Sequence, residues 1–146
     1  MITIYNWGTP LYAQSVDLRN EVLRKPLNMV FYPNELIKEI NCFHIAFIDC
    51  YYTMIACLYL KKVDRNTLQL KQMAVKPGFQ YKGYGSILVR ESERIALLYD
   101  YSTIILHARH TATGFYETLG YMVTSDQFME IGLKHYKMEK NIKKTY

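Results

Sequence analysis

The segment from Met73 to Ser86 constrains the fold most, because it joins an extended apolar run to a helix through a loop rich in glycine. Gly83 and Gly85 permit backbone conformations that turn successive N–H groups toward one point. The start of the following helix adds partial positive charge, and Lys82 adds a full one. Such a loop is suited to the phosphate oxygens of a ligand.

Two common nucleotide motifs do not match this loop. A P-loop carries Gly-Lys-Ser/Thr after a spacer, whereas Lys82 precedes Gly83 here. The dinucleotide fingerprint requires a third glycine at the position of Leu88. ATP hydrolysis and dinucleotide binding are therefore disfavoured, and the loop alone is equally consistent with an ordinary glycine turn that opens a helix.

The hydrophobic pattern around the loop predicts strands and helices in one domain that spans residues 1–146. Helices are expected at 10–26, 85–99 and 112–119, with Gly120 ending the last one. Strands are expected at 2–5, 44–48, 53–60, 67–75, 101–108, 121–128 and 134–139. Residues 27–41 are irregular and predict a functional loop with one helical turn at 35–38. This order of elements predicts an α/β or α+β fold.

Composition and charge limit the classes of protein to which the chain belongs. No run approaches the ~20 consecutive apolar residues of a membrane span, and residues 1–10 lack the pattern of a secretory signal, so neither a membrane protein nor a secreted one is expected. Three cysteines without CxxC spacing (Cys42, Cys50 and Cys57) suit a reducing compartment, and we expect a cytoplasmic location. The net charge is +5, but no nucleic-acid-binding motif accompanies it, so we expect no nucleic-acid partner and no membrane partner.

Two motifs, separated by one helix and one strand, give the most specific signal in the chain. The first is Gln80-x-x-Gly83-x-Gly85 at the start of a helix. The second is Arg109-x-x-Ala112-x-x-x-Tyr116-Glu117-Thr118-Leu119-Gly120-Tyr121. Together they resemble the acyl-CoA signature and the second motif of the GNAT superfamily of acetyl-CoA-dependent N-acetyltransferases.

The resemblance implies a fold and a binding site. The fold would be a three-layer α/β/α domain whose mixed, splayed and mostly antiparallel sheet has about seven strands. Acetyl-CoA would bind as the acyl donor, with its pantetheine arm between the strands that end at Val75 and Ala108. Arg109 stands where many relatives carry asparagine. The residues that the resemblance assigns to acetyl-CoA are Met73, Ala74, Val75, Gln80, Tyr81, Lys82, Gly83, Tyr84, Gly85, Ser86, Arg109 and Tyr116.

The resemblance also implies direct transfer of an acetyl group from acetyl-CoA to a primary amine in a ternary complex. Tyr116 would be the general acid that protonates the leaving thiolate, because a phenol keeps its proton at neutral pH. The backbone N–H of Val75 would donate to the thioester oxygen. The acceptor would be a small-molecule or peptide amine, and a homodimer is left open. The alternative is a module that binds acyl-CoA without catalysis, as a sensor or scaffold.

The general base is less directly indicated. Many relatives carry glutamate on the strand before the glycine loop, whereas Lys71 and Gln72 stand there in this chain. Residues 128–138 resemble the C-terminal ending of a GNAT subgroup, and they include Glu130 and His135. Glu130 is our candidate for the catalytic base, acting through a water molecule, with His135 and water alone as alternatives.

The four histidines do not predict a metal site. His107-x-x-His110 crosses the end of a strand, where side chains three positions apart point in different directions, and no cluster of cysteines or carboxylates completes a ligand set. No metal is therefore expected. His44 and His107 lie on apolar strands, and we expect both to be core histidines with satisfied hydrogen bonds.

Overall fold

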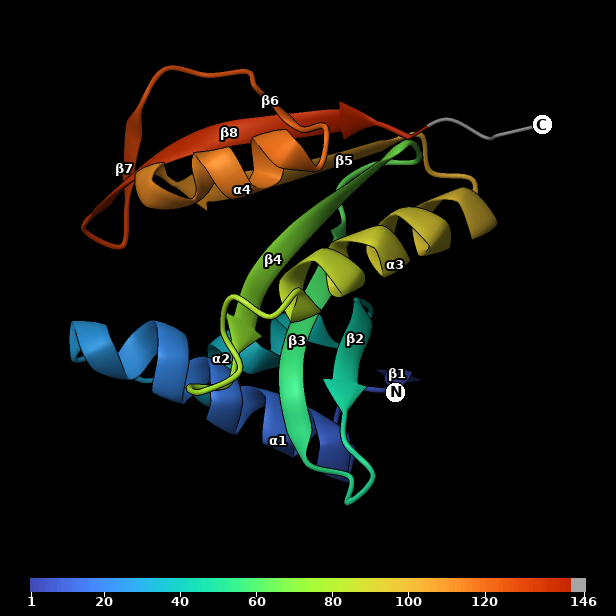
Figure 1. Ribbon diagram of the computed structural model, residues 1–146, viewed down its shortest axis with the longest axis vertical. Helices are drawn as coiled ribbons and strands as arrows, with labels where there is room; N and C mark the ends of the chain where they lie inside the picture. The colour runs from blue at the N-terminus through green and yellow to red at the C-terminus, as the bar shows by residue number, and fades with distance from the viewer. Residues whose placement is uncertain (143–146) are drawn as a thin grey trace. The chain divides into compact units, whose positions relative to one another are not determined.

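The computed structural model describes residues 1–142, which contain eight strands and four α-helices (Figure 1). By their backbone contacts, these residues form two compact units. The first unit comprises residues 1–61 and 71–92, and the second comprises residues 62–70 and the described chain from residue 93 onward. A single domain over residues 1–146 stays a prediction. None of the helices in the described chain is long and apolar enough to cross a lipid bilayer.

Hydrogen bonds join the strands in the order β1-β2-β3-β4-β5-β8-β6, with β7 paired to β8. The sheet is mixed, because β4 and β5 pair in parallel while the ladders of β1 with β2, β2 with β3 and β5 with β8 are antiparallel. This topology confirms the α+β class with a mixed sheet, and the described residues form eight strands where about seven were expected. Strand β4 (Thr67–Val75) contributes residues to both units.

The first unit begins with an antiparallel meander of β1 (Ile2–Tyr5), β2 (Phe43–Ile48) and β3 (Met54–Lys62). The register pairs Tyr5 with His44, and His44 with Tyr59. Paired residues of an antiparallel ladder project to the same side, so these three side chains share one face of the sheet. That face carries the core of the unit, in which α1 also takes part.

Helix α1 (Pro10–Arg19) starts as its sequence predicts. Pro10 lies in the first turn, and Thr9 Oγ1 accepts the N–H of Tyr12 at 3.3 Å. The predicted bounds of 10–26 were too long for an α-helix, because a π-helical turn at Asn20–Arg24 and a 3₁₀ turn at Lys25–Leu27 replace its second half. Pro26 lacks the N–H that would continue an α-helix through this point.

Residues 27–41 are more ordered than the predicted loop. Helix α2 (Pro33–Leu36) starts at a proline, and Glu35 Oε2 accepts the N–H of Tyr32 at 2.9 Å at the start of this helix. A 3₁₀ turn at Ile37–Glu39 continues the segment. The helical turn expected at 35–38 therefore starts at Pro33 and forms part of a longer ordered stretch.

A buried ion pair ties α1 to this segment. Arg19 donates to the two carboxylate oxygens of Glu39 at 2.8 and 3.1 Å, and the Tyr12 hydroxyl donates to Glu39 at 2.8 Å. His44 Nε2 donates to the backbone carbonyl of Glu39 at 2.9 Å. His44 is thus a buried core histidine as predicted, although its Nδ1 has no partner among the described residues.

The second unit is built on β5 (Thr103–Arg109) and β8 (Leu133–Asn141), with β6 (Met122–Val123) and β7 (Phe128–Glu130) also paired to β8. One strand was predicted at 121–128, and the structure has two short strands there instead. The interruption has a physical cause, because the N–H of Lys137 donates at 2.9 Å to the hydroxyl of Ser125 rather than to a backbone carbonyl. A side-chain acceptor in this place interrupts the ladder.

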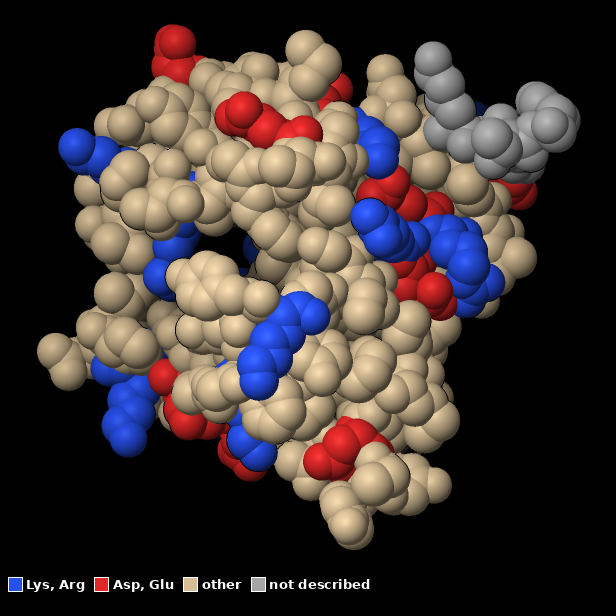
Figure 2. Space-filling view, viewed as in Figure 1, with Lys and Arg blue, Asp and Glu red and all other residues tan. Residues whose placement is uncertain are grey.

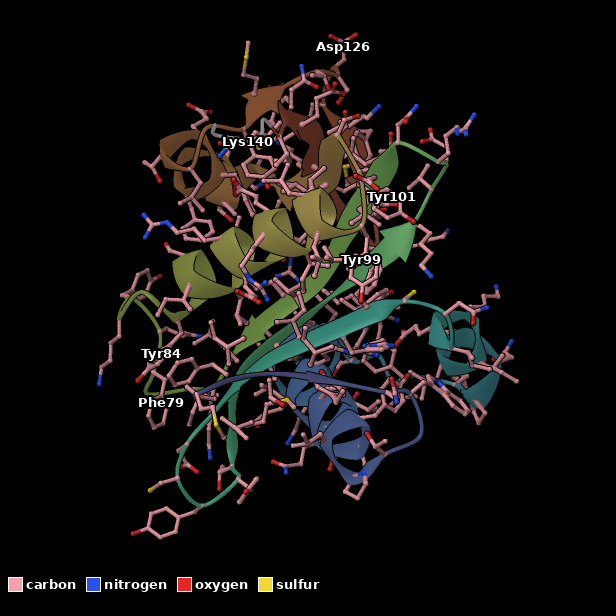
Figure 3. The ribbon with its side chains drawn as sticks, turned by 90° about the vertical axis from the view of Figure 1, so that its right-hand side faces the viewer. Phe79, Tyr84, Tyr99, Tyr101, Asp126 and Lys140 are labelled. Carbon is pink, nitrogen blue, oxygen red and sulfur yellow. The ribbon has the colours of Figure 1, made fainter. Side chains whose placement is uncertain are left out.

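Helices α3 and α4 follow β4 and β5 along the chain. Helix α3 (Tyr84–Leu98) matches the predicted 85–99 closely, and Tyr99 lies beyond its end with an exposed side chain (Figure 3). Helix α4 (Thr113–Thr118) follows a 3₁₀ turn at His110–Ala112 and ends before Gly120, whose φ of 94° stops the helix as predicted. Lys140 Nζ donates to the Leu119 carbonyl at 2.8 Å and so satisfies the end of α4.

Candidate functional site

The glycine loop, residues 76–83, leaves the end of β4 through tight turns. The N–H of Lys76 donates to the Ile55 carbonyl at 2.8 Å, and that of Phe79 donates to the Lys76 carbonyl at 2.9 Å. Three loop residues have positive φ, namely Gly78 at 90°, Tyr81 at 61° and Gly83 at 90°. When left-handed residues alternate with right-handed ones, successive N–H groups turn toward one side and form a concave site for an anion.

Aromatic rings hold this loop against β2 within the first unit (Figure 3). The ring centre of Tyr84 lies 4.8 Å from that of Phe47 and 6.1 Å from that of Phe79. Lys82 Nζ lies 5.7 Å from the ring centre of Phe79. All of these contacts use side chains, so they fix the loop without engaging its backbone N–H groups.

Helix α3 starts directly after the loop. The N–H of Ile87 donates to the Gly83 carbonyl at 3.1 Å, so the amides of residues 84–86 precede the first hydrogen bond of the helix. With 15 residues, α3 is long enough for its dipole to place partial positive charge at this end. The loop amides, the helix start and the charge of Lys82 together can bind a diphosphate.

The end of β4 supplies the backbone next to the loop. Ala74 is buried in the core of the first unit, whereas Met73 and Val75 are partly exposed. Gln80 Nε2 donates to the Val75 carbonyl at 3.4 Å, which ties the loop back to the strand end. The structure thus places residues 73–86 of the predicted acetyl-CoA site together in the first unit.

Gln72 is a feature of this strand that the sequence did not reveal. Its φ of 52° is left-handed, which is rare for a residue other than glycine inside a strand. Its Nε2 donates to the Tyr59 hydroxyl at 3.3 Å, and its buried Oε1 has no partner among the described residues. No sequence pattern marks a left-handed glutamine, because glutamine has no preference for that conformation.

Tyr116 lies on α4 in the second unit, with 7% of its surface exposed. Its ring centre lies 4.9 Å from that of Phe115 and 6.0 Å from that of Tyr121. Burial raises the pKa of Tyr116 to about 12, so the phenol keeps its proton throughout the neutral range. The ring of Tyr116 packs α4 into its unit. Removing the hydroxyl alone would leave this packing in place, and would therefore separate a catalytic role of Tyr116 from a structural one.

Arg109 ends β5 and stands opposite His135 in the register with β8. It immediately precedes the 3₁₀ turn at His110–Ala112, and its side chain forms no capping hydrogen bond there. Arg109 therefore does not cap this turn through its side chain.

Glu130 lies between two histidines of the second unit. His107 Nδ1, on β5, donates to Glu130 Oε1 at 3.0 Å. His135 Nε2, on β8, lies 3.6 Å from Glu130 Oε2. The side chains of Glu130 and His107 are 44% and 32% exposed, whereas that of His135 is 5% exposed. A solvent-exposed carboxylate that is hydrogen-bonded to an imidazole can support proton transfer.

The prediction that His107 is a core histidine was wrong. Its neighbours Leu106 and Ala108 are buried, but the alternation of a strand places His107 on the other face. Phe128 contacts both imidazoles, with ring centres 5.1 Å from His107 and 6.0 Å from His135. The cluster could not be predicted from the sequence, because its members are brought together by the register of three strands and not by a local sequence pattern.

The predicted site residues divide between the two units. Residues 73–86 lie in the first unit, and Arg109, Tyr116 and Glu130 lie in the second. Within residues 1–142, no three His, Cys, Asp or Glu side chains gather in a way that could hold a metal ion.

Comparison with known proteins identifies the family. Residues 32–142, more than half of the chain, match the family described as "Acetyltransferase (GNAT) domain". The chain belongs to the GNAT acetyltransferase family. One relative is the uncharacterized protein YyaT of Bacillus subtilis (strain 168), which is 33% identical to this GNAT chain over 84 residues. These residues make up 58% of this chain and 57% of YyaT. The chain thus spans little more than half the length of this relative.

Solved structures share the fold of this GNAT chain. An aminoglycoside 6′-N-acetyltransferase complexed with coenzyme A has a TM-score of 0.80 at 17% identity, with 100% of this chain and 99% of the other covered. A GNAT family acetyltransferase from Elizabethkingia anophelis with acetyl-CoA bound has a TM-score of 0.73 at 18% identity, with 97% of each chain covered. At these identities the likeness shows the fold, and it confirms the predicted GNAT-like fold class.

Proposed function

We propose that this GNAT chain is an N-acetyltransferase that moves an acetyl group from acetyl-CoA to a primary amine by direct attack in a ternary complex. One observation carries the proposal, the loop between β4 and α3, in which Gly78, Tyr81 and Gly83 have positive φ just before a 15-residue helix. CoA carries a pyrophosphate, which is the kind of anion that such a loop and helix start bind. Two proteins of this fold hold coenzyme A or acetyl-CoA.

Within this proposal, residues 73–86 bind acetyl-CoA. The backbone groups of Met73, Ala74 and Val75 bind the pantetheine arm, and the N–H of Val75 donates to the thioester oxygen. The amides of residues 81–86 and the charge of Lys82 bind the pyrophosphate. Gln80 supports this site by its hydrogen bond to the Val75 carbonyl. Arg109 adds positive charge for the same ligand.

The hydroxyl of Tyr116 is proposed as the general acid. Its raised pKa of about 12 means that the proton is present at neutral pH, as protonation of a leaving thiolate requires. The C–S bond breaks as this proton reaches sulfur, and CoA leaves as the thiol.

The carboxylate of Glu130 is proposed as part of the general base. Its hydrogen bond to His107 and its partial exposure leave it within reach of solvent, so that a water molecule can link it to an acceptor ammonium. The acceptor is a small-molecule or peptide amine. An aminoglycoside heads the set of acceptors to test, because an acetyltransferase of this fold is named for that substrate.

The test follows thiol release from acetyl-CoA in the presence of an aminoglycoside, a polyamine or a lysine-containing peptide. We expect at least one amine to accelerate thiol release, with the acetylated amine detected by mass spectrometry. Binding of acetyl-CoA without any amine-dependent thiol release would instead identify a sensor or scaffold module. Failure to bind acetyl-CoA at all would contradict the proposal.

A further inference from the structure

We propose that Nε2 of His107 is the atom that takes the proton from the acceptor's ammonium group, and that Glu130 is the carboxylate that positions this imidazole. The inference rests on the proposed function, because it names the base of the same reaction. It places the proton-accepting atom on a neighbouring histidine instead of on the carboxylate.

The hydrogen bond between His107 and Glu130 determines which ring nitrogen is free. Glu130 Oε1 lies 3.0 Å from His107 Nδ1. An ionised carboxylate can only accept a hydrogen bond, so the proton of the neutral ring is on Nδ1. Nε2 then carries a lone pair, and the side chain is 32% exposed. A carboxylate that accepts from one ring nitrogen and so prepares the other as a base is the arrangement found in catalytic triads.

Neighbouring groups hold both partners of this pair in place. His135 Nδ1 donates to the Leu133 carbonyl at 2.9 Å, which fixes the ring of His135 with Nε2 at 3.6 Å from Glu130 Oε2. The ring of Phe128 lies edge-on to His107 and stacks on His135. The Glu130 carboxylate of β7 thus lies between an imidazole of β5 and one of β8, and Phe128 contacts both rings.

An imidazole is a better proton acceptor for this purpose than a carboxylate. An ordinary imidazole has a pKa of about 6.5 and an ordinary glutamate one of about 4.3. A base whose pKa lies near the working pH combines an available lone pair with a real tendency to take the proton. When His107 becomes an imidazolium, the negative charge of Glu130 stabilises it directly.

Other charged groups face the same side of the sheet. Lys137 stands opposite His107 in the register of β5 with β8, and Arg109 lies two positions along β5 on the same face. These two cations and the Glu130 carboxylate are the charged groups that the register and the hydrogen bonds place around His107. His135 is the other titratable group of the cluster, so a pH profile must be compared with that of a variant rather than read alone.

In the proposed reaction the attacking nitrogen loses two protons. The acceptor ammonium gives one proton to His107 Nε2, and the resulting neutral amine attacks the carbonyl carbon of acetyl-CoA. The C–N bond forms, the C–S bond breaks, and the sulfur takes a proton from the Tyr116 hydroxyl. The second proton lost by the nitrogen restores the tyrosine, and His107 releases its proton to solvent.

The first test replaces His107 with asparagine. An asparagine amide keeps an N–H for Glu130 but has no equivalent of Nε2. We expect kcat/KM for the amine at neutral pH to fall by ~10² or more, the usual contribution of a general base. Thermal stabilisation by acetyl-CoA should be unchanged, and added imidazole should restore part of the activity to His107→Asn.

His110→Asn is the matched control, because His110 is an exposed histidine that directly follows the same strand. Its activity and pH profile should match wild type. Glu130→Gln should lower kcat/KM less than His107→Asn does, because the glutamine amide oxygen still accepts from His107 Nδ1. The glutamine brings no negative charge, so the acidic limb of the pH profile of Glu130→Gln should move relative to that of wild type. A His107→Asn enzyme with the activity and pH profile of wild type would overturn the inference while leaving the acetyltransferase proposal intact.

A second measurement applies even when no amine of the panel is turned over. Nitrogen NMR of the histidine rings reports which nitrogen carries the proton. We expect the Nδ1–H tautomer for His107 at mildly alkaline pH, because Glu130 accepts the hydrogen bond from Nδ1. The Nε2–H tautomer in wild type would overturn the inference, because no lone pair would then be free on Nε2. Failure of wild type to bind acetyl-CoA is a separate result, which contradicts the proposed function.

Discussion

At the scale of single residues, the glycine loop depends on backbone conformation more than on the space around it. Gly78 and Gly83 both have a φ of 90°, and a Cβ added to either would meet no atom within 4 Å. A larger side chain is therefore disfavoured at both by conformational strain alone. The two glycines differ in position, because only Gly83 directly precedes α3.

This pair gives a matched test of the loop. We expect Gly83→Val to abolish detectable acetyl-CoA binding, since the strained backbone no longer directs the amides beside α3 toward the pyrophosphate. Gly78→Val carries the same type of strain and should lower the melting temperature similarly, with a smaller loss of affinity. Calorimetric titration and thermal unfolding measure the two effects. Wild-type affinity in both variants would mean that the loop is only a turn.

Tyr116 allows catalysis to be separated from packing. Tyr116→Phe keeps the ring contacts with Phe115 and Tyr121 and removes only the hydroxyl. We expect turnover to fall by ~10² or more with little change in acetyl-CoA affinity. The loss should be smaller for acyl donors with a more acidic thiol, because such a leaving group needs less protonation. Equal turnover of the two enzymes, with chemistry rate-limiting, would remove Tyr116 from the mechanism.

At the scale of elements, local patterns predicted the helices and strands better than they predicted the contacts between them. The start of α1 could be read from Thr9 and Pro10, and the end of α4 from Gly120, because caps and stops depend on neighbouring residues. The buried pair of Arg19 and Glu39 could not be read, because its members are distant in sequence and resemble ordinary surface charges. The same reasoning applies to the cluster of His107 and Glu130.

The buried ion pair should be important for stability. Glu39→Gln leaves the Arg19 guanidinium buried without a charged partner, and we expect a loss of ~3 to 5 kcal/mol in the free energy of unfolding. Glu35→Gln is the control, since Glu35 is 41% exposed and lies 3.8 Å from Arg24, and it should change stability by less than ~1 kcal/mol. Urea unfolding measures both. Similar stabilities for the two variants would show that the Arg19–Glu39 pair contributes little.

At the scale of the whole molecule, the order of elements and the fold class were predictable, because hydrophobic periodicity records which segments are buried. The division of 121–128 into two strands was not, since it depends on a hydrogen bond from Lys137 to the side chain of Ser125. For the candidate site, the motif residues could be named from sequence, whereas their hydrogen bonds could not. Figure 2 shows basic and acidic side chains intermingled on the face turned to the viewer, so the net charge of +5 is not gathered there into one patch.

The stability of the molecule should depend on pH through His44. Burial lowers the pKa of His44 below its ordinary value of 6.5 in the folded chain. Well above pH 6.5 the imidazole of His44 is neutral in both the folded and the unfolded chain. Below pH 6.5 the unfolded chain protonates this imidazole more readily than the folded chain does. The free energy of unfolding should therefore fall as the pH drops from 6.5 toward the folded pKa. Urea unfolding across this range should show a shallower slope for His44→Gln than for wild type, and equal slopes would contradict this assignment.

Calorimetric titration of the wild-type chain with acetyl-CoA is the decisive test of cosubstrate binding. We expect one binding site with a dissociation constant in the micromolar range (~10⁻⁶ M). The melting temperature should rise in the presence of the ligand, because a ligand selective for the folded state stabilises it by mass action. Coenzyme A should bind to the same site, because it carries the same pyrophosphate. No heat of binding and no shift in melting temperature at millimolar acetyl-CoA would contradict the claim that the loop between β4 and α3 binds this cosubstrate.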